Sequence, residues 1–136
     1  MAPGIFTLNG SGRGTAAATN STAGYNSPSN PAPAGSTVTF YLTGEGQTKP
    51  RGETGKVTGI NGSSDGPLTP QPLLTPTVTV GGVSATIAFY GEAPGMVAGV
   101  LQLNVQIPAP LPSGSLPLVV SFRGVSSQAS VTVSIQ

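Results

Sequence analysis

Few residues of this sequence belong to the types that enzymes use for chemistry. The chain contains no His and no Cys, which removes the usual general base near neutral pH, the thiol nucleophile and nearly all transition-metal ligation. A glycoside hydrolase needs two carboxylates across a cleft, and Glu45 and Glu53 are candidates for such a pair. They share a polar segment that has no apolar pocket to raise the pKa of either. We therefore predict that the protein is not an enzyme and has no catalytic residues.

The remaining charged residues suggest weaker alternatives. Lys49 and Lys56 lie among many hydroxyls, as in a Ser–Lys dyad, but a lysine acts as a base only when it is desolvated. An isopeptide bond from either lysine stays open, because the spacing selects no partner. Calcium needs several converging oxygen ligands, and Glu45, Glu53 and Asp65 are dispersed. The Gly-rich segments 10–14 and 44–46 precede no helix, so we interpret them as turns and not as phosphate sites. We expect no metal and no cofactor.

Three tyrosines are the candidate ligand-binding residues of this sequence. Aromatic faces are a common surface for stacking against sugars, and Tyr25, Tyr41 and Tyr90 are the tyrosines of the chain. If they lie on an exposed face, they form a platform for a carbohydrate. The alternative is that they are packing and edge residues of the fold.

The elements that would position these residues are β-strands. Residues 37–43 alternate Val38, Phe40 and Leu42 with threonines and a tyrosine, which is typical of a half-buried strand. The same alternation predicts strands at 100–107 and 130–136, with further strands at 78–80, 83–90 and 116–122 and weaker ones at 5–8 and 15–19. No segment has a helical period.

Turn residues separate these strands. Gly81 and Gly82 predict a tight hairpin, and Pro112 to Gly114 and Arg123 with Gly124 predict further turns. Seven to nine strands at this spacing predict an all-β, immunoglobulin-like β-sandwich. We expect one domain over residues 1–136, with leading strands and a loop in 1–36 and a long Gly- and Pro-rich surface loop in 44–76.

The composition of the chain indicates where in or outside the cell the protein is located and which classes of partner it can bind. Only 7% of the 136 residues are charged and the net charge is +1, so the chain has no electrostatic field for nucleic acid. Thr, Ser, Asn and Gln supply most of the polar side chains. We interpret this composition as typical of a secreted or cell-surface protein. No segment is apolar enough to span a membrane, and residues 1–8 lack the features of a signal peptide. We expect that the signal peptide lies on a longer parent protein.

Several motifs of strand and turn residues occur together over nearly the whole chain. They are APGIFT (2–7), NGSGRG (9–14), YLTGEGQT (41–48), VTVGGV (78–83), QLNV (102–105), PSG (112–114) and GVSS (124–127). In this combination the chain resembles the uncharacterised Solibacter C-terminal domain family of acidobacterial exported proteins. The resemblance implies an immunoglobulin-like unit at the end of a long exported protein, and it supplies no functional residue.

Together these features favour a non-catalytic structural or interaction module: a spacer, cap or adhesion unit at the C-terminal end of a large exported bacterial protein. Its expected partners are neighbouring domains of the parent protein, or a second copy bound through edge strands. The alternative function is a carbohydrate-binding module that uses Tyr25, Tyr41 or Tyr90.

Overall fold

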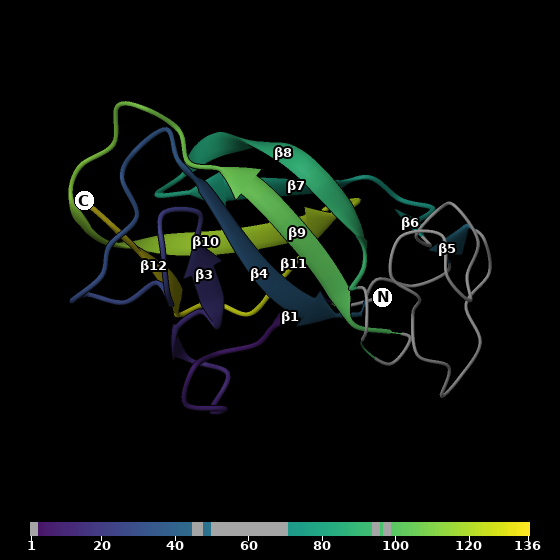
Figure 1. Cartoon of the computed structure of the whole chain (residues 1–136). Helices are drawn as coiled ribbons and strands as arrows, with labels where there is room; N and C mark the ends of the chain where they lie inside the picture. The colour runs from purple at the N-terminus through teal and green to yellow at the C-terminus, as the bar shows by residue number, and fades with distance from the viewer. Residues whose placement is uncertain (1–2, 45–47, 50–70, 94–95, 97–98) are drawn as a thin grey trace.

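The computed structural model describes residues 3–44, 48–49, 71–93, 96 and 99–136 (Figure 1). This part of the chain is all β, as predicted, and none of its segments forms a helix that could cross a membrane. It contains twelve strands, more than the seven to nine predicted, because five of them have only two residues and show no period of their own. The strands are β1 (Gly4–Ile5), β2 (Gly14–Thr15), β3 (Ala18–Asn20), β4 (Thr37–Thr43), β5 (Thr48–Lys49), β6 (Gln71–Pro72), β7 (Pro76–Val80), β8 (Val83–Glu92), β9 (Leu101–Gln106), β10 (Gly114–Phe122), β11 (Val125–Ser126) and β12 (Val131–Ile135).

Ten of these strands form one mixed sheet, which follows the order β1-β4-β9-β8-β7-β10-β12-β2. β3 pairs with β4, and β11 pairs with β10. β12 and β2 run parallel, while the other neighbours in the sheet are antiparallel. The sheet is strongly curled, so that β4 and β9 lie in front of β10 in Figure 1. One core therefore receives side chains from both halves of the sheet, including those of Phe40, Leu42, Leu101, Leu103, Leu118, Phe122 and Ile135.

The predicted strand at 37–43 is confirmed as β4, with the same bounds. Val38, Phe40 and Leu42 are buried, while the residues between them are partly exposed. This is the period-two pattern of a strand with one face on the core. The inward residues predicted for β9 and β12 are also buried: Leu101, Leu103, Val105, Ile107, Val131, Val133 and Ile135.

β8 changes both its partner and its register along its length. Residues 83–85 pair with β7, whereas residues 86–92 pair with β9. Between Ile87 and Phe89 the register shifts, which leaves Ala88 without a partner on β9. Such an extra residue is a β-bulge. Because side chains alternate along a strand, the bulge moves every later side chain of β8 to the opposite face.

The N-terminal segment joins the two ends of the curled sheet. Leu8 N–H donates to the carbonyl of Thr15 (3.0 Å), and Ala17 N–H donates to the carbonyl of Phe6 (2.8 Å). These bonds connect the segment that contains β1 to the segment that contains β2 and β3. An unpaired strand edge is a site for association with other chains, and here the chain itself occupies this edge.

A buried amide cluster, formed by Asn20, Asn26 and Ser134, fastens the residues before β4 to β12. Asn26 Nδ2 donates to the carbonyl of Ser134 (2.8 Å) and to Asn20 Oδ1 (3.0 Å), and Ser134 N–H donates to Asn26 Oδ1 (2.8 Å). Asn26 is fully buried and Ser134 is 2% exposed. The Asn26 carboxamide thus bonds the backbone of β12 next to the isolated bridge between Ala32 and Ile135.

Two predicted hairpin turns are confirmed. Val80 pairs with Val83 across Gly81 and Gly82, whose φ angles are 58° and 81°. Two-residue hairpins with both φ angles positive match the twist of the strands, and glycine adopts such angles without a Cβ penalty. Arg123 and Gly124 make the equivalent turn between β10 and β11.

The ends of the predicted 44–76 loop are held by secondary structure. β5 pairs with β6, and β7 begins at Pro76, inside the predicted loop. Pro72 and Pro76 are buried. Residues 45–47 and 50–70 lie outside the described residues.

Candidate functional site

The outward side chains of β3, β4, β9 and β8, together with Phe6, make up one face of the sheet, which we call the outer face. Paired residues of antiparallel strands point to the same side, so the register sets rows that cross the strands. The first row contains Thr37, Gln106 and Thr86. The second row contains Thr19, Thr39, Asn104 and Phe89. The third row contains Phe6, Tyr41 and Gln102.

The outer face is polar but uncharged. The outward residues of β9 are all amides, namely Gln102, Asn104 and Gln106, and those of β4 are threonines and Tyr41. Charged side chains that the structure describes lie elsewhere: Arg13 and Arg123 are exposed in turns, and Glu92 is buried opposite Leu101.

Asn104 is the centre of a hydrogen-bonded group on this face. Its Oδ1 accepts a bond from Thr39 Oγ1 (3.0 Å) and a bond from Gln102 Nε2 (3.1 Å). Both lone pairs of the carboxamide oxygen are therefore used, and the carboxamide is oriented by its neighbours. Within the described residues, Asn104 Nδ2 and Gln102 Oε1 make no hydrogen bond, which leaves donors and an acceptor for solvent or a ligand.

Two of the three predicted tyrosines lie on the outer face. Tyr41 is in β4, opposite Gln102, and is partly exposed. Tyr25 pairs with Thr19 at the side of β3 and is 66% exposed. The structure thus brings Tyr25 and Tyr41 to one face of the sheet, from segments that are distant in sequence.

Tyr90 lies on the opposite face of β8. It pairs with Leu103, which is buried, and it packs against the core. The bulge at Ala88 is the reason, because without the extra residue Tyr90 would face outward and Phe89 inward.

Two phenylalanines of the outer face were not among the predicted site residues. Phe89 is opposite Asn104 and partly exposed. Phe6 is 42% exposed and lies beside Tyr41, whose carbonyl accepts its N–H (3.1 Å). The sequence signal for Phe6 is the apolar pair Ile5 and Phe6 at consecutive positions, one of which must face outward in a strand. For Phe89 no local signal exists, because its direction depends on the bulge.

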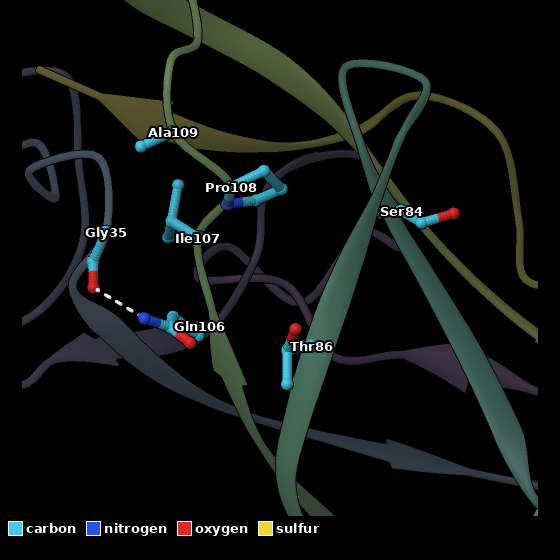
Figure 2. Close-up of a pocket in the computed structure, with 7 residues that line it drawn as sticks. All are labelled: Gly35, Ser84, Thr86, Gln106, Ile107, Pro108 and Ala109. Carbon is cyan, nitrogen blue, oxygen red and sulfur yellow. Dashed lines mark hydrogen bonds between the residues drawn. The ribbon is translucent and has the colours of Figure 1, made fainter.

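A hollow of about 360 Å³ lies at one end of the amide row of β9 (Figure 2). Here β8 turns from β9 towards β7, so the two strands separate beyond the pair Thr86 and Gln106. At one side of the hollow, Gln106 Nε2 donates to the carbonyl of Gly35 at the long distance of 3.4 Å. The lining residues are Gly35, Ser84, Thr86, Gln106, Ile107, Pro108 and Ala109.

The other residues considered for chemistry do not form a site in the described residues. Glu45, Glu53, Lys56 and Asp65 lie outside that part of the chain, and only the backbone of Lys49 is described, in β5. The described part contains no group of three or more residues suited to hold a metal ion.

Comparison with known proteins found no similar protein. No family model matches the chain, and no curated protein or solved structure matches it.

Proposed function

We propose that this chain is an immunoglobulin-like β-sandwich that serves as a non-catalytic structural or interaction module of an exported bacterial protein. Two features support the sandwich: β8 passes from β9 in one half of the sheet to β7 in the other, and both halves bury alternating side chains in one core. The resemblance to the Solibacter C-terminal domain family supports the location at the end of an exported protein.

The observation that carries the proposal is the uncharged outer face. It has hydroxyl, amide and aromatic groups in register over β4, β9 and β8, and no carboxylate or amine among its side chains. Such a face offers hydrogen bonds and ring surfaces for contact. Its described side chains include no carboxylate, imidazole, thiol or amine, which are the groups that most often serve as acid, base or nucleophile.

Contact through this face is favoured over pairing through an edge strand. The edge between β1 and β2 is already bonded within the chain. Beside β3, Asn20 N–H donates to the carbonyl of Gly24 (2.9 Å) and Asn26 N–H to that of Ala18 (2.8 Å), so this edge is also bonded within the chain. At these two edges, a partner would therefore find side chains more readily than free backbone groups.

A pull-down of the producing cells' surface fraction tests this proposal. Thr39→Lys and Asn104→Lys place a charge on the outer face, and Thr77→Lys on β7 is the matched control, because Thr77 is an exposed strand residue away from that face. We expect the two face variants to lose retention of surface components and the control to keep it. Equal retention by all variants, each shown to be folded, would refute contact through the outer face.

A further inference from the structure

We propose that the outer face binds a linear, uncharged polysaccharide, with Tyr41, Phe89 and Asn104 as its main contacts. This inference rests on the proposed function and names the partner class of the same face.

The rings on the face are placed for an extended ligand. Tyr41 and Phe89 lie on the two sides of β9, one row apart. Strand spacings of about 4.8 Å and a rise of about 3.4 Å per residue put them roughly 12 Å apart. A single sugar ring cannot stack on both at that separation, whereas neighbouring units of a chain can. Phe6 and the exposed Tyr25 enlarge the aromatic surface at the sides.

Between these rings lie hydrogen-bonding groups that suit sugar hydroxyls. A hydroxyl both donates and accepts, and the face offers both functions: Asn104 Nδ2 donates, and Gln102 Oε1 accepts. The bonds from Thr39 and Gln102 hold the Asn104 carboxamide in place before a ligand arrives. A pre-oriented group loses less conformational freedom on binding.

The absence of charge on the face selects among glycans. Burial of a charged group without a partner is costly, and the described side chains of this face include neither a cation nor an anion. An anionic polymer such as polygalacturonate would find no counter-charge here. A neutral polymer avoids this cost of an unpaired charge.

The hollow beside Gln106 extends the face at one end. Its volume of about 360 Å³ is near the lower limit of roughly 300–1,000 Å³ for small-ligand sites. Thr86 and Gln106 belong both to the outer face and to the hollow (Figure 2). The long bond from Gln106 to Gly35 is weak, so a sugar hydroxyl can replace it. The hollow therefore adjoins the outer face through Thr86 and Gln106.

Affinity electrophoresis in gels that contain one polysaccharide tests the inference. The probes are the neutral polymers xylan, glucomannan and hydroxyethyl cellulose, with polygalacturonate as the anionic comparison. We expect retardation by at least one neutral polymer and none by polygalacturonate. Retardation should be unchanged by added salt, because no ion pair is involved.

Substitutions then locate the site. Tyr41→Ala and Asn104→Ala should each weaken binding by about fivefold or more, whereas Tyr41→Phe should keep it, because the ring remains. Thr77→Ala is the control outside the face. Circular dichroism and thermal unfolding of each variant separate a binding defect from a folding defect.

The outcomes are distinct from those of the surface-fraction experiment. Binding of no neutral polymer, binding of polygalacturonate alone, or equal binding by the face variants would each overturn the polysaccharide inference. Surface-fraction retention that Asn104→Lys abolishes would still support the proposed function in that case, with a protein as the partner.

Discussion

Two hydrogen-bonded groups that contain carboxamides lie in different surroundings: Asn20, Asn26 and Ser134 form the buried amide cluster, whereas Thr39, Gln102 and Asn104 form a partly exposed group on the outer face. In the first, the Asn26 side chain forms three hydrogen bonds and none of it is exposed to solvent. In the second, the Asn104 oxygen is bonded but its amide nitrogen is not, and the residue is partly exposed.

The difference between the two groups is one of burial and not of residue type. A buried carboxamide with all its bonds holds two parts of the chain together, because breaking those bonds leaves unpaired groups away from water. A carboxamide that is partly exposed can exchange its bonds with solvent at a lower cost. The first group therefore contributes to stability, and the second is available for recognition.

Removal of the buried carboxamide should have the largest effect on stability. Asn26→Ala removes the partner of the Ser134 N–H and of Asn20 Oδ1, while the Ser134 carbonyl keeps its bond from Ala32 N–H (2.9 Å). We expect the substitution to lower the free energy of unfolding by about 3 kcal/mol. Urea denaturation followed by circular dichroism measures this change. A loss as small as that of a surface substitution would show that the cluster does not fasten the N-terminal segment to β12.

Substitution of Gln128 should have an intermediate effect on stability, because its side-chain amide is partly buried and bonds to the backbone of Ile5. Its Oε1 accepts from Ile5 N–H (2.9 Å) and its Nε2 donates to the carbonyl of Ile5 (2.6 Å). We expect Gln128→Ala to lower the free energy of unfolding by about 1.5 kcal/mol and to speed hydrogen exchange of the Ile5 amide. Gln136→Ala, at an exposed residue, serves as the comparison and should leave both quantities unchanged.

A substitution at Ser134 is expected to raise the stability of the fold, in contrast to the substitutions at Asn26 and Gln128. Its Oγ is buried and has no hydrogen-bond partner, while its backbone groups bond to Asn26. Ser134→Ala removes the unpaired hydroxyl and keeps the backbone bonds, so we expect the free energy of unfolding to rise by about 0.5–1 kcal/mol. A decrease measured by urea denaturation would mean that the hydroxyl contributes to stability.

The smallest effect on stability is expected at the partly exposed group of Thr39, Gln102 and Asn104. Asn104→Ala removes two bonds that solvent can replace, so the free energy of unfolding should change by less than about 0.5 kcal/mol. Polysaccharide retention should nevertheless fall in the same variant. If stability drops as far as in Asn26→Ala, the two groups do not differ in the way proposed.

The strands that pair along their full length were predictable from sequence. β4, β9 and β12 each alternate apolar and polar residues, and their inward residues match those expected. The two-residue strands were not predictable, because a pair of residues contains no period. Ser134 is also a case that alternation misses: it is an outward position of β12 but is buried by the segment that contains Asn26.

The candidate site was predictable only in part. Tyr41 was expected on the polar face of its strand and lies there. The shared face of Tyr25 and Tyr41 depends on pairing between β3 and β4, and the amides of β9 join them only through the register of β4 with β9. The directions of Phe89 and Tyr90 depend on a bulge that no residue type marks.

The sequence by itself determined the all-β class, the inward faces of the long strands, two hairpin turns and the lack of His and Cys, because each depends on local period or on composition. Only the tertiary structure decided which side chains share the outer face, which asparagine is buried, and how the ends of the sheet are joined. These depend on strand pairing between segments distant in sequence, and a one-residue change in register reverses the face of every side chain that follows.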